Sequence, residues 1–447
     1  MGNYQAYEKY KDSGVEWLGK IPEHWEAKRL KFISKKIQTG TTPPTNEEEY
    51  YQDGDINWFS PSDFSEGQIH LREAKKKLNR LVLVRKIVKL IPKGSILIIG
   101  IGATLGKVGL LDIDATTNQQ INAVLLDSKD NSKFVAYFLL VSQEIMKVIS
   151  NATTLGILNQ DKTKQIPLTL PPLDEQEMIA NFLDLKTKQI DDLIAKKETL
   201  LAKLDEKRSA IISHAVTKGL DPTVPMKDSK VEWLGDIPKH WGVIPVKFSL
   251  SMPITDGPHE TPEIFDDGIP FISAESVKND ELNFDKKRGY ISLEEHKRFS
   301  KKYKPKYGDV YMVKSGATTG NVARVKTYQE FNIWSPLAVL RPDPEKSTTD
   351  FLFFVIKSKP FFYSVEQSWS FGTQQNIGMG VISNIRIAFP PLDEQQSIAN
   401  FLDKKTVEID LQKAKVQEAI ERLKEYRTAL ITNAVTGKID VRHVSLN

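Results

Sequence analysis

Two stretches of the chain place apolar residues at seven-residue spacing, flanked by lysine and glutamate, with Lys197 as the one polar residue in the first series. The two sets coincide at an offset of 219 residues, as 402 − 183 shows. They are Leu183, Ile190, Leu204 and Ile211 in the first stretch, and Leu402, Ile409, Val416, Leu423 and Leu430 in the second. Heptad spacing predicts two long helices, each of roughly 42 residues and about 63 Å. Neither can bury its stripe alone, so we expect an antiparallel pair; packing of each helix on its own domain is the alternative.

Both stretches begin with nearly the same phrase, LPPLDEQ at 170–176 and FPPLDEQ at 389–395. The prolines disfavour helix upstream. Asp174 with Glu177, and Asp393 with Gln396, have the spacing of a capping box. The sequence therefore predicts helix starts at these two aspartates. We also expect neighbouring apolar residues to widen the stripe, namely Leu193, Leu200 and Ile420.

The duplication extends beyond the helices. VEWLGKIPEHW at 15–25 returns as VEWLGDIPKHW at 231–241, identical at nine of eleven positions. The chain therefore runs domain, helix, divergent second domain, nearly identical second helix, which predicts a pseudo-twofold internal repeat. Four tryptophans in the repeated phrase are expected to anchor each domain at its junction with the helices, each with an N–H that needs a partner: Trp17, Trp25, Trp233 and Trp241.

Composition narrows the class of protein. The 447 residues include 40% hydrophobic residues and no cysteine, which predicts a globular chain in a reducing compartment. No run approaches 18 apolar residues and the first residues are polar, so we expect neither a membrane span nor a signal peptide. A cytoplasmic protein is the expectation.

Positive charge is concentrated in two runs. The net charge is only +4, yet residues 72–93 hold nine Lys/Arg and one acid, and residues 286–306 hold nine and two. Runs of this kind are usually solvated surface, but two of them at matching places in the repeat favour a duplicated polyanion site. The residues that we expect to contact phosphates are Arg72, Lys75, Lys76, Lys77 and Arg80 in the first run, and Lys297, Arg298, Lys301 and Lys302 in the second.

Catalytic patterns are missing from the sequence. GATLGKV at 102–108 resembles a phosphate loop, but only three residues separate its glycines, and the second copy, GATTGNV at 316–322, has Asn321 in place of the lysine. Each is better explained as a strand–turn–strand with glycines at positive φ. His24 and His240 lie in the repeated phrase and are expected to be structural. The sequence predicts a protein without an active site or a cofactor of its own.

The repeated VEWLGxIPxHW and PPLDEQ phrases, with the order of domains and helices, resemble the specificity subunit of type I restriction–modification systems. The resemblance covers nearly the whole chain. It implies an α+β fold: two α/β target-recognition domains separated by two long antiparallel coiled-coil helices. It also implies recognition of a bipartite, asymmetric site in double-stranded DNA, with two methyltransferase subunits and restriction/translocase subunits as partners. S-adenosylmethionine, ATP and Mg²⁺ would belong to those partners.

The expected segments are 1–172 and 219–391 for the recognition domains, and 173–218 and 392–447 for the spacer helices. Polar turn residues are candidates for reading base edges: Thr104, Lys107, Asn118, Gln119 and Gln120 in the first domain, and Thr318, Thr319, Asn321, Gln374, Gln375 and Asn376 in the second. A stand-alone DNA nuclease or methyltransferase with scattered catalytic carboxylates is one alternative. A helical scaffold without a nucleic-acid role is another.

Overall fold

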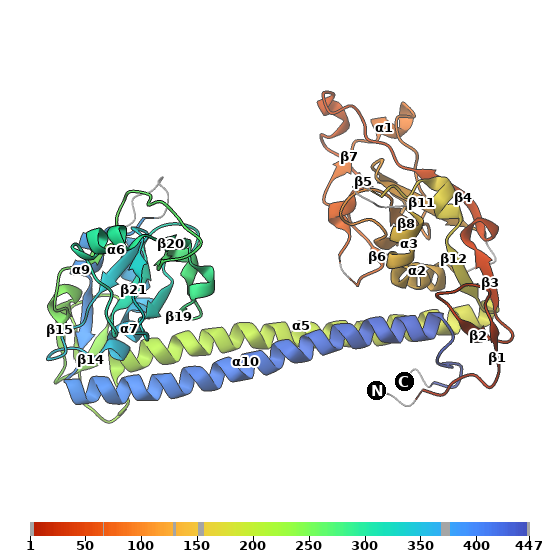
Figure 1. Ribbon diagram of the computed structural model, residues 1–447. Coiled ribbons are helices and arrows are strands. Elements are labelled where there is room, and N and C mark those ends of the chain that lie inside the picture. The colour runs from red at the N-terminus through yellow and green to blue at the C-terminus, as the bar shows by residue number, and fades with distance from the viewer. Residues whose placement is uncertain (1–3, 66, 128–130, 151–155, 368–375, 445–447) are drawn as a thin grey trace. The chain divides into compact units, whose positions relative to one another are not determined.

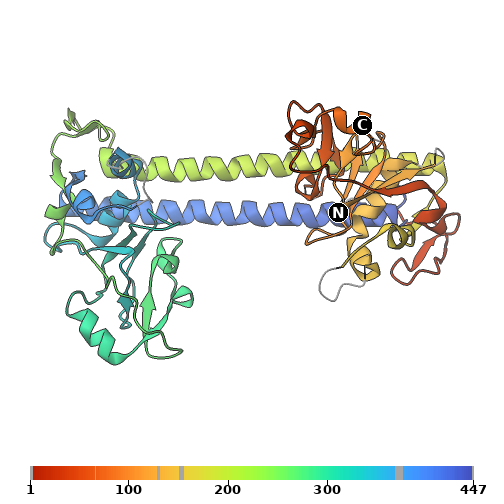
Figure 2. The same cartoon turned by 90° about the horizontal axis from the view of Figure 1, so that it is seen from above.

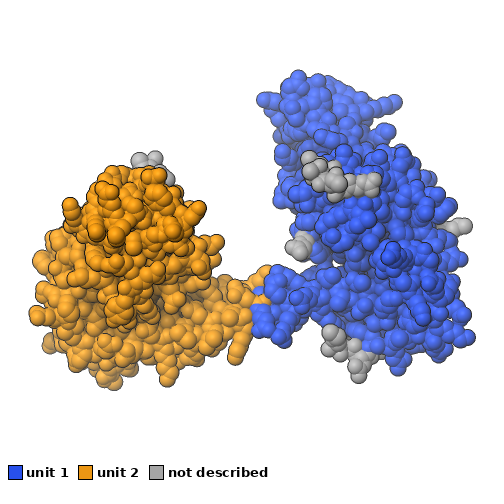
Figure 3. Space-filling view, viewed as in Figure 1, with its two compact units in different colours: residues 1–197, 418–447 blue, residues 198–417 orange. Residues whose placement is uncertain are grey.

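The computed structural model describes residues 4–65, 67–127, 131–150, 156–367 and 376–444. Contacts divide the chain into two compact units: unit 1 holds residues 1–197 and 418–447, and unit 2 holds residues 198–417 (Figure 3). Each unit therefore combines one domain with parts of both long helices. The division into segments 1–172, 173–218, 219–391 and 392–447 describes order along the chain and stays a prediction.

The two long helices are continuous. Helix α5 spans Leu173–Lys218 and α10 spans Leu392–Val435, 46 and 44 residues. In unit 1, Arg427 pairs with Asp191 at 3.0 Å, and in unit 2, Arg208 lies 3.4 Å from Asp410. Position 191 + 219 is 410 and 208 + 219 is 427, so one ion pair occurs in both units with the helices exchanged. Within each unit the helices run side by side in opposite directions (Figures 1 and 2).

Both helices begin one residue earlier than expected. The carbonyls of Pro172 and Pro391 accept the first helical hydrogen bonds, from the backbone N–H groups four residues later, at 2.9 Å each. Asp174 and Asp393 therefore lie inside the first turn, and the predicted capping boxes are wrong. Proline keeps its carbonyl although it lacks an N–H, so it can occupy the position before a helix. Acidic side chains in the first turn still interact favourably with the helix dipole.

The predicted stripe is largely turned inward. The buried members are Leu183, Ile190, Leu204, Leu402, Ile409 and Leu430, and Ile420 beside them is also buried. Ile211, Val416 and Leu423 are half-buried. Leu193 and Leu200 are each 43% exposed, so the expectation that they widen the stripe is wrong. An α-helix of 3.6 residues per turn drifts away from a 3.5-residue repeat, which turns some apolar positions outward.

The domain of unit 1 is built on a five-stranded sheet of order β4-β11-β8-β9-β6. The strands are β4 (Ser34–Thr39), β11 (Ile121–Leu126), β8 (Ile96–Ile99), β9 (Val108–Leu111) and β6 (His70–Leu71). Ile96 and Ile98 join the core that includes helices α2 and α5, whereas Leu97 and Ile99 join the core on the other face. Side chains alternate along a strand, so burial of both faces explains the continuous apolar run of β8.

Smaller elements surround this sheet. A second sheet of order β10-β5-β7 contains β10 (Thr116–Thr117), β5 (Ile56–Phe59) and β7 (Lys77–Leu78). Two further antiparallel pairs join β1 (Tyr10–Asp12) with β2 (Lys20–Pro22), and β3 (Glu26–Arg29) with β12 (Pro167–Leu170) from the far end of the domain sequence. The short helices are α1 (Leu81–Val84), α2 (Ser132–Val141), α3 (Gln143–Ile149) and α4 (Gln160–Lys164).

Unit 2 repeats this architecture in reduced form. Its main sheet has the order β16-β24-β21-β22, with β16 (Thr255–Asp256), β24 (Leu337–Leu340), β21 (Val310–Val313) and β22 (Val322–Arg324). The second sheet comprises β20 (Gly289–Ile291), β17 (Ile269–Ile272) and β23 (Asn332–Ile333). Three further antiparallel pairs join β13 (Met226–Asp228) with β14 (Asp236–Pro238), β15 (Gly242–Pro245) with β25 (Arg386–Phe389), and β18 (Val277–Lys278) with β19 (Glu281–Leu282). The helices are α6 (Leu293–Ser300), α7 (Thr349–Ile356), α8 (Lys359–Gln367) and α9 (Met379–Asn384).

Among the described residues, no helix combines the length and the apolar character that crossing a membrane requires.

Candidate nucleic-acid interface

The repeated tryptophan phrase and the repeated PPLDEQ phrase meet in unit 1. Glu175, in the first turn of α5, accepts hydrogen bonds from Trp25 Nε1 at 3.1 Å and from the Tyr7 hydroxyl at 2.5 Å. The same carboxylate lies 2.7 Å from His24 Nε2. Burial raises the pKa of Tyr7, and the hydrogen bond to Glu175 raises it further, so the phenol keeps the proton that it donates.

Unit 2 repeats this junction. Glu394 of α10 accepts from Trp241 Nε1 at 2.9 Å and lies 2.8 Å from His240 Nε2. The structural role expected for both histidines fits these contacts, although each histidine side chain is more than 40% exposed rather than packed. The anchoring expected for Trp25 and Trp241 also fits. Trp17 and Trp233 differ, because their Nε1 atoms are buried without a hydrogen-bond partner in the described structure.

The glutamine that follows each glutamate fixes a second helix. Gln176 Oε1 accepts from the backbone N–H of Asn131, the residue before α2, at 3.0 Å. Gln395 Oε1 accepts from the backbone N–H of Thr348, the residue before α7, at 3.1 Å. Each long helix therefore holds its domain through neighbouring side chains, one at the tryptophan phrase and one at a helix of the domain.

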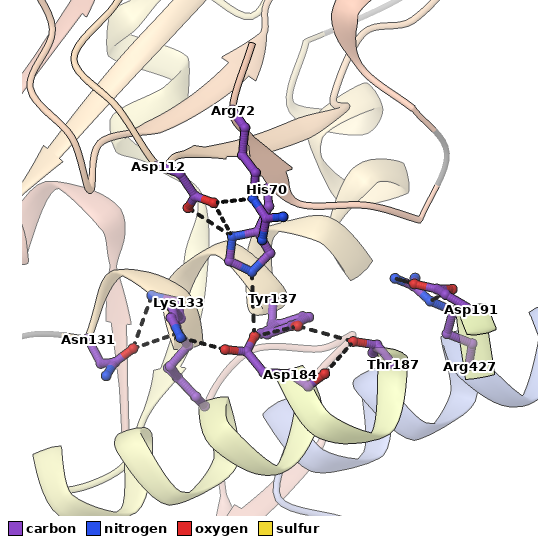
Figure 4. Close-up of polar contacts among 11 residues, drawn as sticks. His70, Arg72, Asp112, Asn131, Lys133, Tyr137, Asp184, Thr187, Asp191 and Arg427 are labelled. Atoms are coloured by element: carbon purple, nitrogen blue, oxygen red, sulfur yellow. Dashed lines mark hydrogen bonds and ion pairs between the residues drawn. The ribbon is translucent and has the colours of Figure 1, made fainter. Parts of the chain in front are cut away.

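A cleft of about 930 Å³ lies between the sheet of unit 1 and the helices of the same unit. His70 of β6 spans it, with Nδ1 2.9 Å from Asp112 and Nε2 3.6 Å from Asp184 of α5 (Figure 4). Lys133 and the Tyr137 hydroxyl also reach Asp184, at 2.5 and 2.8 Å. Burial alone would raise the pKa of Asp184, but the contacts with His70, Lys133 and Tyr137 outweigh it and lower that pKa to about 2. The contact with Asp184 is also the largest cause that raises the pKa of His70.

The polar turn candidates of unit 1 gather at one end of its sheet. Thr104 and Lys107 lie in the turn between β8 and β9, where Gly102 and Gly106 have φ of 100° and 83°, as expected for a strand–turn–strand. Beside this turn, the Gly100 N–H donates to the Gln120 carbonyl at 2.7 Å. The turn and the segment that contains Gln120 therefore form one surface.

The three residues of that segment differ in exposure. Asn118 is 7% exposed and donates from Nδ2 to Gln120 Oε1 at 3.0 Å, so it shapes the loop rather than facing solvent. Gln119 is exposed and accepts from the Thr42 hydroxyl. Of the three, Gln119 and the half-exposed Gln120 are available to a ligand without rearrangement.

The first basic run does not form a single patch. Strand β6 pairs in parallel with β9, with Leu71 opposite Leu111. Arg72 follows β6 whereas Lys107 precedes β9, so the two side chains start from opposite ends of the sheet. Arg72 there forms an ion pair with Asp112 at 2.9 Å. The other members follow around β7: Lys75 donates to the Ser62 carbonyl, Lys76 is exposed, Lys77 pairs with Glu73 and Arg80 pairs with Asp55.

In unit 2 the basic run and the turn that carries the polar candidates are linked by one buried carboxylate. Lys297 and Arg298 lie on α6, and Lys301 and Lys302 follow it. Lys302 Nζ lies 2.6 Å from the buried carboxylate of Asp256, which also faces Lys314 Nζ, at the end of β21, at 3.3 Å.

Burial alone would raise the pKa of Asp256, but its bond to Lys302 and the charge of Lys314 lower it. Asp256 thus joins the end of the basic run to the base of the β21–β22 turn. Nothing in the sequence pattern indicated Asp256, because its partners Lys302 and Lys314 are far away along the chain.

The β21–β22 turn carries the remaining candidates of unit 2. Thr318 is exposed, the Thr319 hydroxyl donates to the Gly316 carbonyl at 2.7 Å, and Asn321 Nδ2 donates to the Val277 carbonyl at 3.2 Å. Asn376 is exposed and forms an isolated bridge with Ser315 beside the turn. Gln374 and Gln375 lie outside the described residues. No cluster of three or more His, Asp or Glu suited to a metal ion occurs in the part of the chain that the structure describes.

The two units thus share one frame, namely the contacts by which Glu175 and Gln176 in unit 1, and Glu394 and Gln395 in unit 2, hold a domain on its long helix. They differ in the turns at the end of the main sheet. This is the organisation of a protein with two separate recognition domains. The chain belongs to the family of type I restriction modification DNA specificity domains, whose model matches residues 22–204 and 257–422. By family it is a specificity subunit and not a catalytic subunit, which confirms the assignment made from the repeated phrases.

Relatives and solved structures agree with this assignment. The chain is 25% identical to the type I restriction enzyme MjaIX specificity subunit of Methanocaldococcus jannaschii, over 96% of each chain. It is 23% identical to the EcoBI specificity subunit of Escherichia coli, over 73% of this chain and 69% of that one. A structure from work on assembly and conformational transition of the type I R-M system matches with a TM-score of 0.68 and 15% identity, over 93% of this chain and 98% of that chain. The HsdS subunit from Thermoanaerobacter tengcongensis matches with a TM-score of 0.50 and 16% identity, over 94% and 98%. The predicted fold is thereby confirmed.

Proposed function

We propose that this chain recognises a bipartite, asymmetric site in double-stranded DNA, with the domain of each unit reading one half-site. The observation that carries the proposal is the repetition of one frame under two unlike sets of turns. Glu175 with Trp25 and Glu394 with Trp241 hold the two domains in the same way. The turn residues differ, with half-exposed Lys107 in unit 1 where unit 2 has exposed Asn321. Unlike turns on a common frame would read unlike half-sites.

Lysines and polar turn residues would divide the work of binding. Lys297 and Lys301 are exposed and form no ion pair within the described residues of unit 2, so phosphates could take their charge without displacing a carboxylate. Gln119 of unit 1 and Thr318 of unit 2 are exposed on turns and suit hydrogen bonds to base edges.

We further propose that the frame docks two methyltransferase subunits, with restriction/translocase subunits joining them. A frame that occurs twice offers two copies of one partner equivalent surfaces. S-adenosylmethionine, ATP and Mg²⁺ would then act on those partners. The structure of the matching type I R-M chain comes from work on complex assembly, and this is consistent with such partners.

Binding and activity assays test the proposal against its alternatives. Affinity of the full chain for duplex DNA should fall steeply with salt, with a log–log slope of about −0.9 for each phosphate contacted. A flat dependence would favour the scaffold without a nucleic-acid role. Incubation of the purified chain with DNA, Mg²⁺ and S-adenosylmethionine should give neither cleavage nor methyl transfer. Either product, from the chain alone, would favour the stand-alone enzyme.

A further inference from the structure

A small lobe of the unit 1 domain ends in an exposed aliphatic tip. The lobe has its own core of Tyr50, Trp58, Leu78, Val82 and Val88. The tip consists of α1 and the residues that follow it up to position 90, and α1 and β7 lie at the end of the domain away from α2 and α5 (Figure 1). Its base is therefore rigid, although it projects from the domain.

Two apolar side chains of the tip face solvent. Val84 is 72% exposed and Leu90 is 44% exposed. Single exposed aliphatic residues are common on protein surfaces and need no explanation by themselves. The charges and contacts around Val84 and Leu90 set them apart.

Cations surround these side chains. Residues 80–93 contain five Lys/Arg and no acid. Arg80 pairs with Asp55, and Arg85 pairs with Glu49 while it lies over the Tyr50 ring, 5.4 Å from the centroid. These two arginines fasten the tip to its lobe.

Two lysines of the tip remain available. Lys86 and Lys89 are exposed and form no ion pair among the residues that the structure describes. Lys86 has φ of 56°, a left-handed conformation that is uncommon outside glycine and that ends the α1 turn. The tip therefore presents two unpaired cations beside Val84.

The lobe is joined to the surface that carries the polar turn candidates. Trp58 Nε1 donates to the Thr41 carbonyl at 3.2 Å, and the Tyr51 hydroxyl donates to the Pro43 carbonyl at 2.8 Å. The hydroxyl of Thr42, which lies between Thr41 and Pro43, donates to Gln119 Oε1. Through the short segment 41–43, the tip and the Gln119 turn are held at the same end of the domain.

We propose that the tip is a base-reading element that enters the major groove of double-stranded DNA. Lys86 and Lys89 contact phosphates, and Val84 packs against a base edge, for which the thymine C5-methyl is the apolar group in that groove. The inference rests on the proposed function and adds a residue to it. Because Arg85 and the core of the lobe already fix the tip, little conformational entropy is lost on contact. In unit 2 the basic run contains the eight-residue helix α6 instead.

Selection from a randomised pool of duplexes tests the role of Val84. The full-length wild-type chain, Val84→Ala and the control Val148→Ala each select sequences, and Val148 on α3 is 73% exposed. Val84→Ala should lose preference for thymine at one or two adjacent positions of one half-site, with about tenfold weaker binding, as expected for two methyl groups. A pool with deoxyuridine in place of thymine should abolish the difference between wild type and Val84→Ala.

The outcomes separate this inference from the proposed function. Enrichment of the same sequences by wild type and Val84→Ala would overturn the role of Val84 and leave the proposed function standing. Failure of the wild-type chain to enrich any sequence would overturn both. Unchanged melting temperatures of the exposed-site variants exclude unfolding as the cause.

Salt titration on a duplex of random sequence tests the lysines. Lys86→Ala and Lys89→Ala should each reduce the magnitude of the log–log salt slope by about 0.9. Lys196→Ala, at an exposed position of α5, should leave the slope unchanged. Equal slopes for all three variants and wild type would overturn the phosphate contacts.

Discussion

Removal of Glu175 should destabilise unit 1 more than removal of its counterpart Glu394 destabilises unit 2. The Glu175 side chain is 4% exposed and accepts from two buried donors, Trp25 and Tyr7. The Glu394 side chain is 28% exposed and accepts from one buried donor, Trp241. A buried hydrogen bond to a charged group contributes about 1.5–3 kcal/mol.

The expected loss follows from counting buried donors. Glu175→Ala leaves two of them unpaired and should lower the free energy of unfolding by about 4 kcal/mol. Glu394→Ala should lower it by about 2 kcal/mol. We give the half-exposed histidines little weight, because solvent screens their ion pairs. Glu175→Gln keeps an acceptor oxygen without the charge and should recover about half of the loss.

Hydrogen exchange measured by mass spectrometry can follow each junction separately. Glu175→Ala should speed exchange in the first turns of α5 and leave those of α10 unchanged, and Glu394→Ala should do the reverse by a smaller factor. Equal losses from the two variants, or a larger loss from Glu394→Ala, would refute the argument from burial.

Three further outcomes are expected. The pKa of His70 is raised above 6.5, first by Asp184, so its stabilising charge is complete below pH 6.5 and lost as the pH rises through the folded-state value. The stability of unit 1 should therefore fall as the pH rises above 6.5, and the same fall in His70→Gln would contradict this. Trp17→Ala should lower the melting temperature, because half-buried Trp17 packs against Phe138 with 5.7 Å between ring centroids; an unchanged melting temperature would remove its anchoring role. A seven-residue insertion into each long helix at the unit boundary adds about 10.5 Å and should widen the gap between half-sites by about three base pairs, read from selected sequences. An unchanged gap would refute the helices as the spacer.

The spacing of apolar residues correctly predicted the two long helices, because helix formation and the buried face of a helix depend mostly on local sequence. The heptad positions identified α5 and α10 and most of their buried stripe, because burial on a long helix follows spacing. The helices begin one residue before the predicted aspartates, and the residue that caps each helix lies two positions earlier, at Pro172 rather than Asp174 in α5, because its carbonyl accepts the first helical bond. Leu193 was misplaced because the drift of a straight helix past a heptad repeat depends on its local winding.

The site was less accessible to this reasoning. The repeated phrases drew attention to Trp25, but nothing in the spacing indicated Glu175 as its partner 150 residues away. The basic run of unit 1 reads as one patch in sequence, yet the parallel pairing of β6 with β9 carries Arg72 to the end of the sheet opposite Lys107. Such contacts depend on strand order, which a charge run does not encode.

The most direct measurement is the sequence of the methylated sites in the genome of a host that carries this chain with its partner subunits. The account predicts an asymmetric motif of two short blocks separated by a fixed gap. Replacing the domain of unit 2 by that of another family member, with both long helices retained, should change one block and leave the other block and the gap as they were. A single continuous motif, or a change of both blocks on that replacement, would contradict the account.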